Sequence, residues 1–170
     1  PGTQIAPNRP IGALPIVGIA ATDGFCSVYI SKYLMNREVG FGRRLLQIFE
    51  DEGISFEHTP SGIDNMSVIV RESTFNKAAE ERVLRRVRTK LAVDEVTVER
   101  DLALVMVVGE GMNHTIGLAG RACTAFAEAG VNLEMINQGS SEVSMMFGIK
   151  ANDIPGSVRA LYDQFFGSSA

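Results

Sequence analysis

The chain has 170 residues, of which 45% are hydrophobic and 21% are charged, and its formal net charge is −4 at pH 7. This length allows one medium domain or two small ones. The acidic balance argues against a nucleic-acid partner, because proteins that bind nucleic acids favour a basic surface. The apolar run Leu102–Val108 is much shorter than the roughly 20 residues of a membrane-spanning helix, so we also expect no membrane partner.

The first segment of the chain, residues 1–13, is rich in proline and polar residues, and we expect a linker there. The chain begins with Pro rather than Met and shows no secretory signal, which favours a fragment of a longer protein over a natural subunit. Cys26 and Cys123 lie far apart in apolar segments. We therefore expect buried free thiols in a reducing compartment, and a cytoplasmic location.

Strand-like and helix-like segments alternate after this linker. A strand-like segment at 14–21 comes first, and a strand rich in β-branched and aromatic residues is expected at 25–34. An amphipathic helix follows and ends at Gly53, in the place of a left-handed residue. The pattern then predicts a hairpin over 54–70, a helix over about 74–90 and a strand over 94–101.

The same order of elements begins again at residue 102. The pattern predicts a strand over 102–109, a helix that ends at Gly130, a hairpin over 131–149 and a helix over 153–166. Asp153 is the expected cap of this last helix. No strand is expected after it, because only residues 167–170 remain.

The two halves are copies of one unit. An ungapped comparison at an offset of 77 residues pairs Met35–Val70 with Met112–Phe147, and nine of these 36 positions are identical. The identical pairs are Met35/Met112, Asn36/Asn113, Gly40/Gly117, Arg44/Arg121, Phe49/Phe126, Gly53/Gly130, Glu57/Glu134, Gly62/Gly139 and Ser67/Ser144. This similarity without a gap indicates a duplicated domain, with too few repeats for a solenoid.

Each copy follows the order βαββαβ of the split-βαβ, ferredoxin-like plan, so the expected fold class is α+β. Copy two lacks a fourth strand of its own, and an unpaired sheet edge is prone to aggregation. We therefore expect the strand at 14–21 to cross over and complete the sheet of copy two. The expected domains are 22–100 for copy one, and 14–21 plus 101–170 for copy two.

Enzyme signatures are absent from the sequence, which has no phosphate-binding Gly-rich loop, no zinc-protease motif and no nucleophile elbow. His58 and His114 lie at non-equivalent positions of the repeat. We therefore expect no catalytic and no metal-binding residues. The Arg-rich segment 82–90 suggests phosphate binding, but acidic residues flank it on both sides, and this favours a solvated helix face.

Small-molecule binding is the chemistry that the repeated loops favour. Gly40 and Gly117 stand at helix starts, where glycine permits close approach and free N–H groups bind a carboxylate. The strand that follows the helix would lie beside this loop and offer carbonyls to an ammonium group, and Glu57 could receive a cationic side chain. The alternative is that these glycines only form tight turns, and that Glu57 and Glu134 are exposed strand residues.

The segments MNREVGFGRRLLQIFEDEGISFEHTPSGIDNMSVIVR and GLAGRACTAFAEAGVNLEMINQGSSEVSMMFGI resemble tandem ACT domains. They are similar in particular to the C-terminal regulatory region of monofunctional bacterial aspartate kinases (aspartokinases), over about residues 14–167. The stretch INQGSSEVSMMFGI is the more specific part of this resemblance. The leading strand LPIVGIAA also resembles the segment that completes the second ACT unit of these enzymes.

The resemblance implies a site for an amino-acid effector, lysine or threonine or both, that acts in feedback inhibition. The effector-binding residues that it implies are Met35, Glu38, Val39, Gly40, Phe41, Gly42, Ser55, Phe56 and Glu57. Glu57 matches a position that receives the side-chain ammonium of lysine, whereas Val39-Gly40 departs from the Pro-Gly or Arg-Gly of several relatives. The matching pocket of copy two would contain Asn113, Thr115, Ile116, Asn137 and Gln138, with Glu134 in a structural role.

The resemblance also implies which partners the chain has. Aspartate kinases phosphorylate aspartate with MgATP in the pathway to lysine, threonine and methionine, in a catalytic domain that precedes the regulatory region. The Lys-Phe-Gly-Gly motif of that domain is absent here, so we expect this chain alone to be inactive and to bind no cofactor. The expected partners are the effector, a catalytic domain or catalytic subunit, and a second copy of the chain in a homodimer.

Two alternatives remain at this point. The first is a stand-alone ACT sensor, such as a regulatory subunit of another amino-acid biosynthetic enzyme or a transcriptional regulator. The second is a duplicated ferredoxin-like module that only mediates assembly.

Overall fold

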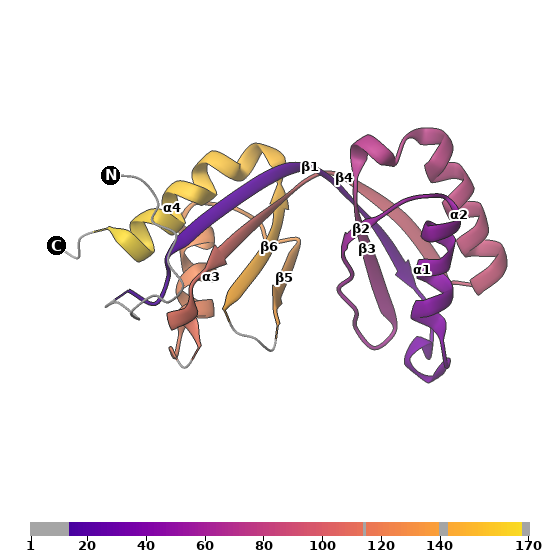
Figure 1. The fold of residues 1–170 in the computed structure, drawn as a ribbon, viewed down its shortest axis with the longest axis horizontal. Coiled ribbons are helices and arrows are strands. Elements are labelled where there is room, and N and C mark those ends of the chain that lie inside the picture. Colours follow the sequence, from indigo (N-terminus) through magenta and orange to yellow (C-terminus); the bar gives the residue numbers. More distant parts are fainter. Residues whose placement is uncertain (1–13, 114, 140–142, 168–170) are drawn as a thin grey trace, which may run out of the picture. The chain divides into compact units, whose positions relative to one another are not determined.

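The computed structural model describes residues 14–113, 115–139 and 143–167, in which strands and helices alternate (Figure 1). The predicted linker at 1–13 lies outside the described residues. The strands and α-helices are β1 (Gly18–Ser31), α1 (Phe41–Asp51), β2 (Phe56–His58), β3 (Asn65–Arg71), α2 (Lys77–Leu91), β4 (Glu95–Val108), α3 (Leu118–Glu128), β5 (Met135–Gln138), β6 (Ser144–Lys150) and α4 (Ile154–Phe166). Among the described helices, none has both the length and the apolar character to cross a membrane.

Copy one forms a compact unit, Thr22–Leu104. Its strands have the order β2-β3-β1-β4, and both β1 and β2 pair antiparallel with β3. Alternate residues of the strands, such as Val28 and Val68, point into a core that Leu45 of α1 and Val83 of α2 complete. This arrangement confirms the predicted βαββαβ plan.

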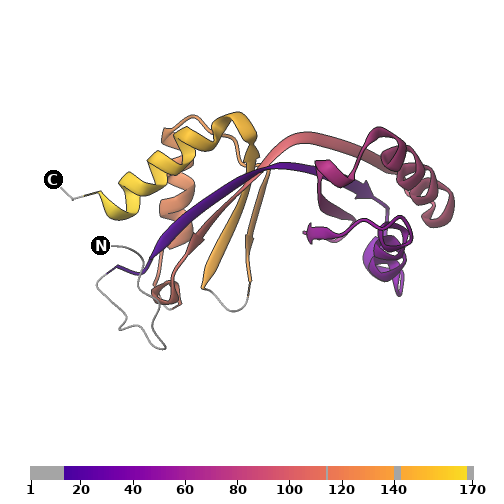
Figure 2. The ribbon, with the colours of Figure 1, turned by 45° about the horizontal axis from the view of Figure 1, so that its top comes forward.

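Copy two forms a second unit, from the described residues up to Ala21 and from Val105 onward. Its strands have the order β5-β6-β4-β1, so β1 supplies the edge that copy two lacks (Figure 2). The Val17 N–H donates to the Val108 carbonyl over 2.8 Å. A Cβ atom on Gly109 would overlap the backbone of Pro15, which shows how closely the two segments pack. The predicted crossing strand is confirmed.

Two pairs of predicted strands turn out to be single long strands. The segments predicted at 14–21 and 25–34 lie largely in β1, and those at 94–101 and 102–109 lie largely in β4. Gly24 (φ 82°) and Asp101 (φ 60°) stand at equivalent positions of β1 and β4, both in the left-handed region. Glycine adopts this region freely and Asp tolerates it. Neither residue makes the chain turn back. β1 and β4 therefore each continue from one unit into the other.

The offset between the copies changes within the hairpin. Helices α1 and α3 begin at Phe41 and Leu118, an offset of 77, whereas β3 and β6 begin at Asn65 and Ser144, an offset of 79. Buried and exposed residues alternate in nearly the same way along β3 and β6 at this second offset. The identity between Ser67 and Ser144 therefore does not mark equivalent positions, because copy two has two additional residues before β6.

The first helix of each copy ends as predicted at a left-handed glycine, Gly53 (φ 69°) and Gly130 (φ 70°). In both copies the next N–H, of Ile54 or Val131, donates over 2.9 Å to the carbonyl five residues earlier. This is the hydrogen-bond pattern of a Schellman motif. The prediction for α4 was wrong in one respect, since Asp153 occupies the N-cap position without making a side-chain capping bond.

Candidate functional site

The loop between β1 and α1 carries Met35, Glu38, Val39 and Gly40, and α1 begins with Phe41 and Gly42. Two hydrogen bonds tie its start to neighbouring turns: the Lys32 N–H donates to the Asp64 carbonyl over 2.9 Å, and the Tyr33 N–H donates to the Asp94 carboxylate over 2.6 Å. Met35 and Phe41 are buried in the core of copy one. The side chains of these two predicted residues therefore anchor the loop to the core.

The start of α1 is suited to bind an anion. Gly40 has φ 77° at the N-cap, a conformation that favours glycine, and makes no side-chain capping bond. The Phe41 N–H donates to the Glu38 carbonyl over 3.1 Å, so the N–H groups of Gly42 and Arg43 are the ones left for other acceptors. The same holds for α3, whose N-cap Gly117 has φ 86° and no side-chain capping bond. Both copies present a helix N-terminus of the kind that binds a carboxylate.

An exposed apolar residue precedes each of these glycines. Val39 is 93% exposed and Ile116 is 99% exposed, and the two occupy equivalent positions of the repeat. A single exposed apolar side chain needs no explanation. Its recurrence at the same place in both copies fits a contact with a ligand or with another protein chain.

Glu38 is already neutralised by neighbouring bases. Its carboxylate lies 2.6 Å from Lys32 Nζ and also forms an ion pair with Arg44. The hydrogen bond from Lys32, assisted by Arg44, lowers the pKa of Glu38 below its ordinary value. Arg44 in addition donates to the Val39 carbonyl over 3.2 Å. Glu38 therefore fixes the shape of the loop together with these bases, and its charge is not free for the ammonium group of a ligand.

Ser55, Phe56 and Glu57 are exposed at the edge of the sheet of copy one, where β2 has β3 as its neighbour. The register of β2 shifts between Phe56 and His58, so Glu57 occupies a bulge, which changes the direction of its side chain. Glu57 Oε1 lies 3.1 Å from Arg71 Nε, and the two side chains are 40% and 42% exposed. Such an exposed pair contributes little to stability, so Glu57 can exchange Arg71 for another cation.

The loop and the start of β2 lie at opposite ends of copy one (Figure 1). Gly40 precedes α1 and Ser55 follows it, and a helix of 11 residues is roughly 16 Å long. In the sheet, Phe56 is level with Cys26, since both pair with Val70, and β1 continues for five more residues, roughly 16 Å, before the loop. The expectation that this strand lies beside the loop within one copy is therefore wrong.

The residues of the second predicted site are not divided in this way. Asn137 and Gln138 end β5 and pair with Met146 and Met145. They lie close to Val143, whose carbonyl accepts from the Gly109 N–H at the start of the loop before α3. Asn113, Thr115 and Ile116 are exposed before α3, whereas Asn137 and Gln138 lie in the edge strand β5. Thr115 donates its hydroxyl to the Gly111 carbonyl over 2.6 Å and so closes the turn. His114, in the middle of this loop, lies outside the described residues.

Glu134 differs from Glu57, its counterpart in copy one. Its carboxylate accepts a hydrogen bond from the Asn132 amide over 2.9 Å. Its N–H donates to the Gly148 carbonyl over 2.8 Å and holds the chain at the start of β5. Glu57 is thus paired with a base, whereas Glu134 is paired with a neutral amide.

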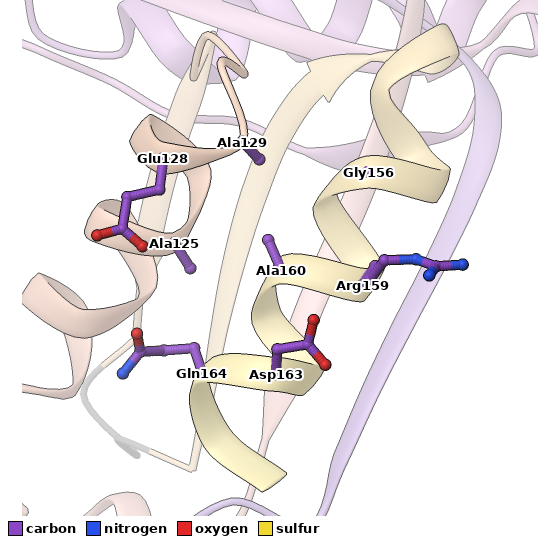
Figure 3. A pocket seen from close by; sticks show the side chains of 8 residues that line it. All are labelled: Ala125, Glu128, Ala129, Gly156, Arg159, Ala160, Asp163 and Gln164. Carbon is purple, nitrogen blue, oxygen red and sulfur yellow. The ribbon is translucent and has the colours of Figure 1, made fainter. Parts of the chain in front are cut away.

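A hollow of about 480 Å³ lies between α3 and α4 of copy two (Figure 3). Alanines from both helices point into the space between them, while the side chain of Arg159 points away from α3 (Figure 3). The lining residues are Ala125, Glu128, Ala129, Gly156, Arg159, Ala160, Asp163 and Gln164. None of the predicted effector-binding residues belongs to this hollow.

Other reactive side chains offer no site. No group of three or more His, Cys, Asp or Glu residues that could hold a metal ion is found among the described residues. Cys26 is buried, and burial raises the pKa of its thiol to about 11. Cys123 is only half-buried, contrary to the expectation for both thiols. Burial lowers the pKa of His58, which favours its neutral form.

The sequence reasoning missed the bases around the predicted acids, namely Lys32, Arg44 and Arg71. Arg44 carried a signal, because it is one of the positions identical between the copies. Its counterpart Arg121 instead donates to the Gln164 carbonyl over 2.6 Å, so the identity does not preserve the contact. Lys32 and Arg71 gave no comparable signal in the sequence.

The chain is similar to known proteins over almost all of its length. Residues 105–165 match the ACT domain family. The chain is 56% identical to aspartokinase 3 of Bacillus subtilis (strain 168) over 165 residues, which make up 97% of this chain and 36% of that protein. It is 26% identical to aspartokinase 1, chloroplastic, of Arabidopsis thaliana, over 99% of this chain and 30% of that protein. The chain thus spans about a third of the length of these curated relatives.

Solved structures show the same similarity. Clostridium acetobutylicum aspartate kinase matches with a TM-score of 0.84 at 36% identity, over 88% of this chain and 34% of that chain. The regulatory subunit of aspartate kinase from Thermus thermophilus shares the fold, with a TM-score of 0.74 at 22% identity, over 89% of this chain and 98% of that chain. The chain therefore belongs to the family of ACT-domain regulatory regions of aspartate kinases.

Proposed function

We propose that this chain binds a free amino acid and thereby regulates the phosphorylation of aspartate by the catalytic domain or catalytic subunit of an aspartate kinase. The observation that carries the proposal is the start of α1, where Gly40 makes no side-chain capping bond and the N–H groups of Gly42 and Arg43 are left for a carboxylate. In this proposal the chain itself transfers no phosphoryl group and needs no cofactor, since that chemistry belongs to the catalytic part of the enzyme.

Lysine is the first candidate effector, and threonine is the second. The α-carboxylate of lysine would bind at the start of α1, and the side-chain ammonium of lysine would replace Arg71 at Glu57. The structure of E. coli aspartokinase III in complex with lysine and aspartate has the same fold, with a TM-score of 0.72 at 19% identity. Threonine carries no side-chain cation, so it would use the helix N-terminus without the charge of Glu57.

The effector would be shared between two copies of the chain in a homodimer. One small ligand cannot reach both the loop before α1 and Ser55–Glu57 within one copy, because roughly 16 Å separates the two ends of an 11-residue helix. A second chain that presents its exposed β2 edge to the loop would bring the two halves of the site together. The exposed Val39 and Phe56 would then be covered by this contact.

Regulation follows if the dimer has more than one arrangement. An effector that joins the loop of one chain to the β2 edge of another favours the arrangement in which these surfaces meet. It can act as a switch only through this difference in affinity between arrangements. The loop with Asn113, Thr115 and Ile116, together with Asn137 and Gln138 at the same end of the sheet, offers a second site in copy two.

Calorimetric titration of the chain with lysine, threonine and methionine tests the proposal. We expect lysine to bind, and Glu57→Ala to weaken lysine at least about tenfold, since a charge-assisted hydrogen bond is lost, while threonine is affected much less. Glu134→Ala is the matched control in copy two and should leave lysine binding unchanged. If none of the three amino acids binds at millimolar concentration, or if Glu57→Ala weakens lysine and threonine equally, the proposed site is wrong.

A further inference from the structure

A hollow between α1 and α2 of copy one has a basic lining. Its volume is about 200 Å³. The lining residues are Arg43, Arg44, Gln47, Ile48, Asp51, Arg86, Lys90 and Leu91. Four bases thus face a single acid, although the whole chain has a formal net charge of −4.

Two of the four bases form no ion pair with a described residue, although Lys90 acts on Asp51 from a greater distance: hydrogen bonds from Gln47 and Arg86, with electrostatic contributions from Arg86 and Lys90, lower the pKa of Asp51. Arg86 forms ion pairs with Asp51 and Glu52, and Arg44 forms one with Glu38. Arg43 and Lys90 form no ion pair or hydrogen bond with any of the residues that the structure describes. Two like charges on the walls of one hollow repel each other, and an anion between them removes this repulsion.

The rest of the lining suits a small organic anion. Ile48 and Leu91 are each 2% exposed and form an apolar floor, and the amide of Gln47, which donates to Asp51 over 2.9 Å, adds a polar group. Arg43 lies in the first turn of α1, where the helix dipole also favours negative charge. Guanidinium groups match the oxygens of a phosphate in pairs, whereas Lys acts as a point charge. An apolar floor with a few convergent polar groups is typical of small-molecule sites.

Copy two shows which of these bases the fold does not require. At the offset of 77 residues, Gly120 and Thr124 occupy the positions of Arg43 and Gln47. The hollow between α3 and α4 has one base, Arg159, and two acids, Glu128 and Asp163. Arg44 has a counterpart in Arg121, whereas Arg43 has none, so the packing of the two helices does not account for Arg43.

We propose that the hollow between α1 and α2 binds a small phosphate-bearing anion, held mainly by Arg43 and Lys90. Arg44 links this hollow to the loop before α1, because it lines the hollow and also contacts Glu38 and the Val39 carbonyl. An anion that draws Arg44 into the hollow weakens these two contacts and changes the affinity of the loop for an amino acid. This second step rests on the proposed function, whereas the anion site itself does not.

Titration of the chain, followed by NMR of its backbone and arginine side chains, tests the site with inorganic phosphate and with adenosine monophosphate. We expect both probes to shift the signals of Arg43, Arg44 and Lys90. The variant Arg43→Gln, Lys90→Gln should weaken binding at least about tenfold. The control Arg85→Gln, Arg88→Gln removes the same charge from the exposed face of α2 and should change the affinity by less than about twofold.

Several results would overturn the anion site: no binding of either probe at about 10 mM, signal shifts elsewhere on the chain, or equal losses in the two double variants. Equal losses would mean a diffuse attraction by net charge. The two probes separate the sources of the phosphate group, since a tighter fit of the nucleotide indicates a phosphate ester on the apolar floor. A Glu-rich peptide serves as a third probe. If it binds here while neither phosphate does, the hollow docks an acidic protein segment and the proposal is wrong.

The link through Arg44 has its own test. We expect phosphate at saturating concentration to change the affinity for lysine severalfold, and lysine to change the affinity for phosphate by the same factor, because such coupling is reciprocal. An unchanged lysine affinity overturns the link but leaves the anion site standing. If lysine does not bind at all, the proposed function fails, and the phosphate titration still decides the anion site.

Discussion

The two copies share a backbone plan and differ in how their helix pairs are joined. In copy one, Arg82 and Arg86 of α2 form ion pairs with Glu52 at the end of α1, at 2.7 Å and 2.9 Å. If the buried stripes of α2 and α4 are aligned, Val83 with Leu161, then Ala160 and Gln164 take the places of these two bases. Ala129 takes the place of Glu52. After the duplication the core and the glycines stayed alike, while the charges between the helices diverged.

This difference teaches which residues the fold depends on. Both units form although one of them lacks the ion pairs between its helices, so these pairs are not a condition for folding. What the copies keep is a buried phenylalanine in the first helix, Phe49 or Phe126, and a left-handed glycine at each end of it. Equivalent substitutions in the two copies can therefore show which residues both units need for folding and which residues matter in one unit only.

The largest effect is expected in the shared core. Phe49→Ala and Phe126→Ala each remove a ring that is 1% exposed, and each should lower the free energy of unfolding by about 3–5 kcal/mol. Phe49 packs against Phe75 with ring centroids 6.4 Å apart, and Phe126 packs against Phe147 at 4.9 Å. Urea unfolding measures both losses. A loss below about 1 kcal/mol in one copy would show that its core is not packed as described.

A smaller and equal effect is expected at the helix starts. Gly40→Ala and Gly117→Ala place a Cβ on a left-handed residue, and each should cost about 1–2 kcal/mol. Steric overlap adds nothing, because Gly117 has no atom within 4 Å of the added carbon and Gly40 has only a guanidinium nitrogen at 3.9 Å.

Gly120→Ala is the matched control for these glycines, since Gly120 lies inside α3 and also has open space around it. It should stabilise the chain by up to about 1 kcal/mol, because alanine favours a helix over glycine. Thermal unfolding in the same buffer compares the three variants. Stabilisation by Gly40→Ala would contradict the left-handed conformation at that position.

The smallest effect is expected from the ion pairs that only copy one has. Hydrogen bonds from Arg82 and Arg86 hold the pKa of Glu52 below its ordinary value of 4.5. A carboxyl group whose pKa is lowered on folding stabilises the protein above the pKa of the unfolded chain, and this contribution is lost as the pH falls through the folded value. Glu52→Gln should therefore be less stable than the wild type at pH 7, and the difference should shrink below about pH 4.5.

Urea unfolding between pH 3 and pH 7 measures this difference, with Ala129→Gln at the equivalent position of copy two as the control. The control should show no comparable dependence on pH, since no carboxylate is removed there. If the difference in stability between Glu52→Gln and the wild type persists unchanged into acid, the loss comes from packing and not from charge.

Much of this fold could be predicted, because its signals are local. The helix ends at Gly53 and Gly130 follow from the conformational freedom of glycine, and the order of elements follows from the periodicity of apolar residues. The missing strand of copy two could be inferred from a count of strands in each copy. These features depend on neighbouring residues or on the repeat itself.

The errors concern features that the local sequence does not encode. Gly24 and Asp101 are typical turn residues, yet each stands within a continuous strand, because partner strands hold the backbone extended on both sides. The two additional residues before β6 escaped an ungapped comparison, since turns vary in length.

The residues of the effector site stay a prediction, and their placement in space could not be predicted from the sequence. The position of Ser55 relative to Gly40 depends on the direction and length of α1, which turn one list of residues into two half-sites. The ion pairs of Glu38 and Glu57 could not be predicted, because no motif describes the spacing between these acids and their bases.

The long strands β1 and β4 have a consequence for how such a protein can change. Each has 14 residues and runs through both units of the six-stranded sheet, so inserting one residue in the middle would exchange the inward and outward faces in one unit only. A chain cut between Leu104 and Val105 would leave the second unit without the part of β1 that ends at Ala21, whereas the first unit, Thr22–Leu104, is one continuous segment. Although it arose by duplication, the pair is no longer symmetric: copy one is inserted between the two segments that form copy two, so copy two depends on residues from both sides of copy one.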